Sequence, residues 1–271
     1  MRRLIVNADD FGRSASINEA VVLAHRDGIL TTASLMVNEP HAASAIAMAR
    51  GNPRLGVGLH LTLVRGKAAL DTRTIPHLVN GQSEFSTNAA VAGMRYFFSR
   101  ACRAELRLEI AAQFEKFQAT GFALDHVNGH LHLHLHPVVL QILLENASQW
   151  KIRSMRLTAD PYFLNKRLAS GRRFYRVSHA VIFGLLARRA ASRLRQHGIQ
   201  ATSAVFGLLQ NGRVDRAYVE KLLPLLPEGD SELYSHPSLG QFKNEFDALV
   251  YPGIRAQVRE LDIRLIRYQD L

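Results

Sequence analysis

Short apolar runs alternate with longer segments of helical periodicity along most of the chain. The apolar runs, rich in Val, Ile and Leu, predict strands at residues 4–6, 33–37, 56–61, 123–127, 154–157, 199–205 and 232–235. Between them, apolar residues recur every three or four positions, which predicts helices at residues 16–27, 41–50, 89–120, 137–149 and 214–223, and a mostly helical tail over 243–266. Alternation of strands and helices is typical of a parallel sheet whose crossovers are helices.

The pattern predicts a single α/β domain over residues 1–271 without internal repeats or a low-complexity linker. We expect a (β/α)-barrel variant, either TIM-barrel-like or an incomplete, distorted form of one. Ser16 and Glu19 form a capping-box pattern at the start of the first helix, and Gly28 ends it. Residues 62–87, with scattered Gly and Pro, predict a long loop over one face.

The charge of the chain is strongly basic and unevenly distributed. The net charge is +11 and the pI is about 10.3, a balance that indicates an acidic partner such as nucleic acid, a phosphate-bearing ligand or an anionic membrane. Between Pro161 and Arg213 there is no Asp or Glu, although ten Lys and Arg residues lie there. We interpret residues 161–213 as a basic helical insertion in the domain.

The amino-acid composition limits the cellular compartments in which the protein is expected. A hydrophobic content of 47% and a charged content of 21% are ordinary for a globular domain. The single cysteine, Cys102, excludes an intrachain disulfide and fits a reducing compartment. The first ten residues have only a three-residue apolar run, too short for a secretory signal, and no apolar stretch reaches membrane-span length. We therefore expect a cytoplasmic protein, soluble or peripheral on the inner face of the membrane.

Two adjacent carboxylates, Asp9 and Asp10, directly follow the first predicted strand in the run NADDFG. In barrel enzymes the carboxyl ends of the strands are where catalytic sites are built. The alternative is that one of these carboxylates only caps a turn. His60 ends the glycine-rich strand GVGLHL, and by itself a histidine there is more often a hydrogen-bonded core residue than a ligand.

Five of the twelve histidines lie within the stretch from His126 to His136. In an extended segment, the two-residue period would place the last four of them, His130, His132, His134 and His136, on one face. Desolvating that many imidazoles without a partner is costly, which favours metal binding or proton transfer. The individual roles of His126, His132, His134 and His136 stay open, and some of them could form an exposed polar face.

Arg156 and His236 each follow a further predicted strand, so polar residues stand at five strand ends and would meet at one rim. One Asp with His60 and His130 is a ligand set suited to Zn²⁺, Co²⁺, Ni²⁺, Mn²⁺ or Fe²⁺ with open positions for water and substrate. Metal-bound water loses a proton near neutral pH, the other Asp could take that proton, and a histidine across the site could protonate a leaving group. These are the parts of amide or ester hydrolysis.

The motifs NADDFG, GVGLHL, DHVNGHLHLHLHP and SHP, in this order, resemble the YdjC-like carbohydrate deacetylases over residues 4 to about 240. The resemblance implies a (β/α)-barrel variant that hydrolyses the N-acetyl group of an amino sugar, in which a metal-bound water attacks the amide carbonyl. It implies one divalent ion, Mg²⁺ or Zn²⁺ first, with Co²⁺, Ni²⁺ or Mn²⁺ as options, held by Asp10, His60 and His130.

The resemblance also implies roles for three other residues. Asp9 would be the general base, His236 the general acid, and Arg156 a residue that orients Asp9. Related sugar deacetylases often have Asp where this chain has Asn128, which leaves open what supports the metal ligand near His130.

Within the family, NGHLHLHLHP looks most like the members associated with hopanoid biosynthesis, which implies an N-acetylglucosaminyl hopanoid as substrate. The basic segment 161–213 could then contact a membrane, since arginines flank the apolar run VIFGLL. The alternative is a solvated basic helix packed on the barrel. A soluble chitooligosaccharide is the other substrate option, and a homodimer is compatible with the sequence.

Two other functions are compatible with parts of the sequence. A non-haem iron oxygenase also uses two His and one carboxylate, but it has no evident need of a second adjacent carboxylate. A basic membrane-binding or nucleic-acid-binding protein would account for the charge. The basic residues lack the interleaved aromatics of single-strand binders and no nucleic-acid motif occurs, so we expect no nucleic-acid partner.

Overall fold

The computed structural model describes all 271 residues as one α/β domain. Its centre is a sheet of seven parallel strands, which are in chain order β1 (Arg2–Phe11), β2 (Thr32–Leu35), β3 (Gly56–Leu61), β4 (Val127–Gly129), β5 (Ala204–Phe206), β6 (Gly229–Ser235) and β7 (Arg264–Ile266). The strand order is β4-β3-β2-β1-β6-β5, with β7 paired to the start of β1. The predicted barrel variant is thus confirmed in the form of a half-barrel.

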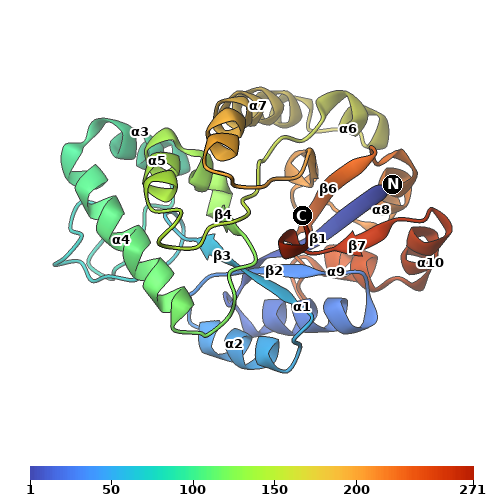
Figure 1. The fold of residues 1–271 in the computed structure, drawn as a ribbon, viewed down its shortest axis with the longest axis horizontal. Coiled ribbons are helices and arrows are strands. Elements are labelled where there is room, and N and C mark those ends of the chain that lie inside the picture. Colours follow the sequence, from blue (N-terminus) through green and yellow to red (C-terminus); the bar gives the residue numbers. More distant parts are fainter.

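Ten helices surround this sheet (Figure 1). They are α1 (Ala15–Asp27), α2 (Ala42–Arg50), α3 (Ala89–Phe98), α4 (Arg100–Gln118), α5 (Pro137–Glu145), α6 (Tyr162–Leu168), α7 (Arg173–Gln196), α8 (Arg216–Leu222), α9 (Lys243–Val250) and α10 (Pro252–Glu260). Short 3₁₀ segments complete the list: η1 (His130–Leu135), η2 (Leu208–Gln210), η3 (Leu223–Leu225) and η4 (Tyr268–Asp270). In Figure 1, α3 and α4 lie at the left, α6 and α7 along the upper edge, and α1 and α2 below the sheet.

The strands are nearly continuous apolar runs because helices cover the sheet, and 56 buried residues form one main hydrophobic cluster. The sheet continues weakly beyond β4. Isolated parallel bridges join Val127 to Met155 and Ser154 to Gln200, so the predicted strand 154–157 exists only as bridges. These bridges still bring the segment before Arg156 beside β4.

Several predicted boundaries were wrong for local reasons. Ser14, not Ser16, caps α1 by accepting from the Ile17 amide, while the Ser16 hydroxyl accepts from the Leu239 amide instead. The predicted helix 89–120 is interrupted at Ser99, whose extended backbone (ψ 121°) ends α3 and whose side chain caps α4. The fourth strand covers Val127–Gly129 rather than 123–127.

The prediction of a mostly helical tail over 243–266 is confirmed by α9 and α10, but the short strand β7 at its end, which pairs with β1, was not predicted. The basic segment 161–213 contains helices α6 and α7, but it also includes β5 of the central sheet and is therefore not purely an insertion. No helix of the structure is both long enough and apolar enough to cross a bilayer.

Candidate active site

The two adjacent aspartates lie within β1 rather than after it, at an irregularity in the sheet. The register between β1 and β2 shifts between Ala8 and Phe11, so the pairing is interrupted where Asp9 and Asp10 stand. Asp10 has a left-handed backbone (φ 64°), which is uncommon for a residue with a side chain. Such irregularities redirect side chains, and here they allow two consecutive carboxylates to serve one site.

Neighbouring strands bring the histidines to Asp10. His60 lies on β3, and His130 follows the last residue of β4. Oδ1 of Asp10 lies 2.9 Å from Nδ1 of His130 and 3.4 Å from Nε2 of His60. One ligand atom from each of the three residues lies within 4.8 Å of the others, and all three residues are buried. The structure therefore brings together the three residues expected to bind a metal.

The Oδ1 atom of Asp10 is buried and has no hydrogen-bond partner. Its other oxygen, Oδ2, accepts a 2.8 Å hydrogen bond from Nη1 of Arg13, a residue that the sequence interpretation missed. Burial opposes ionisation of Asp10, but the neighbouring His130 and His60 hold its pKa well below the usual range. A buried, ionised carboxylate oxygen without a partner beside two imidazoles has the chemistry of a cation site.

Asp9 is bound on the opposite side by Arg156. Nη1 and Nη2 of Arg156 donate to the two oxygens of Asp9 at 2.7 and 2.9 Å. Burial works against ionisation of Asp9, yet the charge of Arg156 and its hydrogen bonds hold the pKa of Asp9 well below the usual range. Oδ1 of Asp9 also accepts from the amides of Asn7 and Asn128, whereas Oδ2 accepts only from Arg156.

The guanidinium of Arg156 is shared with a second carboxylate that the sequence interpretation missed. Arg156 is fully buried, and its Nε and Nη2 donate to Glu232 of β6 at 3.0 and 2.7 Å. The hydroxyl of Tyr268 donates to the same Glu232, and the guanidinium stacks over the ring of Tyr234 at 4.2 Å. A buried charge is tolerated only when it is paired and hydrogen-bonded, and here both conditions are met.

Asn128 supports His60 rather than His130. The two residues face each other across β3 and β4, and Nδ1 of His60 donates to Oδ1 of Asn128 over 2.7 Å. The amide nitrogen of Asn128 donates to Ser34 and to Asp9. A partner on one ring nitrogen fixes the tautomer, and this one leaves Nε2 of His60 free to face Asp10.

The expectation that His130, His132, His134 and His136 share one face of an extended segment was wrong. Residues 130–135 form the 3₁₀ segment η1, with left-handed backbone at Leu131 (φ 49°) and His132 (φ 59°). The turn directs His130 toward Asp10, while the other three side chains point to separate partners.

The other three histidines form hydrogen bonds that stabilise the fold around the site. His132 is hydrogen-bonded to the hydroxyl of Tyr234, His134 to the carbonyl of Arg156, and His136 to the carbonyl of Gly93. Burial lowers the pKa of all three, to about 3 for His134, so they are neutral at physiological pH.

His126 also belongs to the packing of the sheet. Its ring lies between Ser34 and Asp125, at 2.9 Å from each, and stacks on Tyr268. A Cβ at Gly58 would lie 2.4 Å from this ring, which explains one glycine of the GVGLHL strand. The histidine-rich motif thus contributes one residue to the cluster of Asp10, His60 and His130 and four to its surroundings.

His236 follows the last residue of β6 and is half-buried at the edge of the site. Its backbone amide donates to Oε2 of the fully buried Glu245 at 2.6 Å, and its Nδ1 lies 3.9 Å from the same oxygen. Its ring centroid is 5.9 Å from that of Tyr234, which packs on Arg156. All six residues singled out in the sequence therefore meet at one rim.

The fold and the site together define a half-barrel protein with a buried cluster of one Asp and two His whose geometry suits a metal ion, beside a second carboxylate and a half-buried histidine. This chemistry is typical of metal-dependent hydrolases. Residues 3–261 match the family of YdjC-like proteins, and the chain belongs to that family.

Similar sequences include the carbohydrate deacetylase of Brevibacillus brevis, 39% identical over 150 residues, or 55% of this chain and 57% of the relative. The carbohydrate deacetylase of Geobacillus stearothermophilus is 37% identical over 166 residues, or 60% of this chain and 63% of the relative. The chain thus matches somewhat less than two thirds of the length of these relatives.

Among solved structures, a protein of Enterococcus faecalis assigned to cellobiose-phosphate cleavage has a TM-score of 0.75 and 21% identity, with 99% of this chain and 98% of that chain covered. A lactam utilization protein of Thermus thermophilus has a TM-score of 0.51 and 12% identity, with 97% and 98% covered. At these identities the similarity shows the fold.

Proposed function

We propose that this chain is a metal-dependent hydrolase that removes the N-acetyl group of an amino sugar, with one divalent ion held by Asp10, His60 and His130. The observation that carries the proposal is the buried Oδ1 of Asp10, which has no hydrogen-bond partner and faces two imidazoles. Leaving such an oxygen unpaired would cost free energy, and a cation would remove that cost. The names of the relatives support the substrate class.

The bound ion would supply a Lewis acid that polarises the amide carbonyl and lowers the pKa of water, and Zn²⁺, Mg²⁺, Co²⁺, Ni²⁺ or Mn²⁺ are the candidates. Asp9 is the general base of the proposal. Its Oδ2 accepts one hydrogen bond, from Arg156, and so keeps a lone pair for the attacking water. Arg156 holds the pKa of Asp9 well below the usual range, so Asp9 is ionised at neutral pH.

His236 is the general acid of the proposal. It donates a proton to the departing amine nitrogen, so that acetate and a free amino sugar result. Its half-buried position lets it reach both the site and solvent, and Glu245 holds its backbone in place. Arg156 does not take part in proton transfer, because its guanidinium is occupied by Asp9 and Glu232 and stays charged.

For the particular substrate we infer an N-acetylglucosaminyl group linked to a hopanoid, with a soluble chitooligosaccharide as the alternative. The motif NGHLHLHLHP supports the lipid-linked substrate through its resemblance to hopanoid-associated members. An enzyme for such a substrate would work at the inner face of the membrane. An iron oxygenase is disfavoured because it would have no use for Asp9, held by Arg156 next to the ligand Asp10.

The test is acetate release from an N-acetylglucosaminyl lipid and from chitooligosaccharides, with metal content measured on the same preparation. Asp10→Asn and His130→Ala should lose both bound metal and activity while keeping the circular dichroism spectrum. His197→Ala, an exposed histidine on a distant helix end, is the matched control and should change neither. Full activity after complete removal of metal by a chelator would contradict the proposal.

A further inference from the structure

Exposed apolar side chains are concentrated on three helices. Of the fourteen large hydrophobic side chains that are exposed, ten lie on α3, α6 and α7. On α7 the series Phe174, Val177, Val181 and Leu185 follows helical spacing and forms a stripe that faces outward. On α3, Met94 and Phe98 form a shorter stripe, and Phe98 is 76% exposed.

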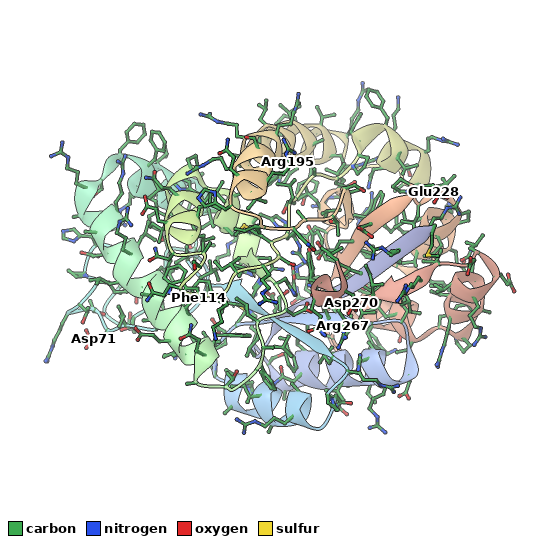
Figure 2. All side chains as sticks on the ribbon, in the orientation of Figure 1. Asp71, Phe114, Arg195, Glu228, Arg267 and Asp270 are labelled. Atoms are coloured by element: carbon green, nitrogen blue, oxygen red, sulfur yellow. The ribbon has the colours of Figure 1, made fainter.

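The two stripes lie on neighbouring parts of the molecule. Figure 1 shows α6 and α7 along the upper edge and α3 at the upper left, and Figure 2 shows side chains projecting outward from these helices. The stretch from His132 to His136 connects α3 with α7, because His132 of η1 packs on Phe183 of α7 and His136, which follows η1, packs on Phe97 of α3. We call the outward surface of α3, α6 and α7 the upper face.

The charge of the upper face is positive and unneutralised. No acidic residue occurs from Pro161 to Arg213, and the nearest one before it, Asp160, is buried. Arg172, Arg173, Arg188 and Arg189 are exposed at the two ends of the α7 stripe, and none of them forms a salt bridge. An apolar stripe with cations at both ends is complementary to a surface that has an apolar interior and anionic groups on its outside.

We propose that the upper face docks on an anionic lipid surface, with α7 lying in the plane of the membrane interface. The apolar stripe would enter the boundary between headgroups and acyl chains, and the arginines would contact the anionic headgroups. This inference goes beyond the proposed chemistry and does not depend on it, because docking needs neither the metal nor the substrate.

Two other occupants fit the upper face less well. A second copy of the chain would bring the unpaired arginines of two α7 helices together, and like charges in an interface are unfavourable. A nucleic acid would satisfy the arginines, and bases could stack on the exposed Phe174, but it would leave the aliphatic residues Val177, Val181 and Leu185 in the middle of the α7 stripe without an apolar partner. Only a lipid surface satisfies the apolar and the cationic parts together.

Docking through the upper face would place the site close to the lipid. The segment η1 starts with His130 of the cation site and lies between α3 and α7.

The test is sedimentation of the purified protein with vesicles of phosphatidylcholine alone or with added phosphatidylglycerol, without substrate. We expect binding to the anionic vesicles that weakens with salt. Arg188→Gln with Arg189→Gln should weaken it by roughly 30-fold at low salt, since each basic residue near the surface contributes about 1 kcal/mol. Phe98→Asp and Phe174→Asp should each weaken it by about 10-fold or more, because an apolar side chain no longer enters the interface.

Matched controls carry the same changes elsewhere. Met48→Asp, on α2 at the opposite edge of Figure 1, and Arg54→Gln with Arg255→Gln should bind like the unchanged protein. Sedimentation equilibrium and duplex DNA binding are measured on the same proteins. The inference is overturned by no binding to anionic vesicles, by equal binding of upper-face and control variants, or by a dimer or DNA complex that the upper-face changes disrupt while lipid binding is absent. Since acetate release is a separate assay, failure of docking and failure of the proposed chemistry are distinguishable.

Discussion

Replacing Arg156 with methionine should destabilise the protein strongly, because it leaves two buried carboxylates without their counter-charge. In the folded state Arg156 donates to both oxygens of Asp9 and to Glu232, and all three side chains are 3% exposed or less. Breaking a buried ion pair by removing one partner typically costs about 3–5 kcal/mol. For a chain of this length that loss lowers the thermal midpoint by on the order of 10 °C.

The assay is urea unfolding at neutral pH, followed by circular dichroism. Lys243→Met is the matched control, since the Lys243–Asp247 pair is 59% and 52% exposed and such a surface pair contributes only about 0.3–0.5 kcal/mol. The double variant Arg156→Met with Glu232→Gln should be more stable than Arg156→Met alone, because one uncompensated charge is removed with the guanidinium. A cost for Arg156→Met as small as that for Lys243→Met would refute the reasoning.

Three further predictions concern the site and its surroundings. His236→Ala should lower kcat by about 10²–10⁴-fold with metal content unchanged, as expected for the loss of a general acid, which steady-state kinetics would show. Asn128→Ala should weaken metal affinity by about 10–100-fold, because Nδ1 of His60 loses its 2.7 Å partner, and competition with a chelating dye measures this. Burial raises the pKa of Asp160 to about 7, so the folded state keeps a proton that the unfolded state releases above about pH 4. Stability should therefore fall as pH rises from about 4 to 7, and unfolding curves of Asp160→Asn should lack that slope. A kcat of His236→Ala near the unchanged value, unaltered metal affinity in Asn128→Ala, or the same pH slope in Asp160→Asn would each contradict its prediction.

The sequence was sufficient to predict the sheet and the residues at its rim because both follow from local pattern. Apolar runs marked six of the seven strands, and polar residues at their ends, such as His60 and His236, are conspicuous against those runs. The seventh strand, β7, has three residues and pairs with β1 across 261 positions between Arg3 and Arg264, so its helical surroundings concealed it.

The supporting residues could not be predicted as easily, since their partners are distant in the sequence. Glu232 lies 76 residues from Arg156, and nothing local shows that the two form an ion pair. One signal was present: an acid directly before Leu233 and Tyr234 in a predicted strand needs a counter-charge if it is buried, and Arg156 was the available candidate. The prediction for the histidine-rich segment was wrong for another reason. A two-residue period was assumed, but a left-handed turn at Leu131 and His132 replaces the strand.

That turn and the backbone of Asp10 have a consequence for adapting this protein to heat. Asp10, Leu131 and His132 all have positive φ angles, and a left-handed conformation costs a residue with a side chain about 1–2 kcal/mol compared with the usual helical one. Screening for heat-resistant variants would therefore favour glycine at Leu131, next to His130. The same exchange would loosen the turn that aims His130, so heat resistance and activity would compete at this position.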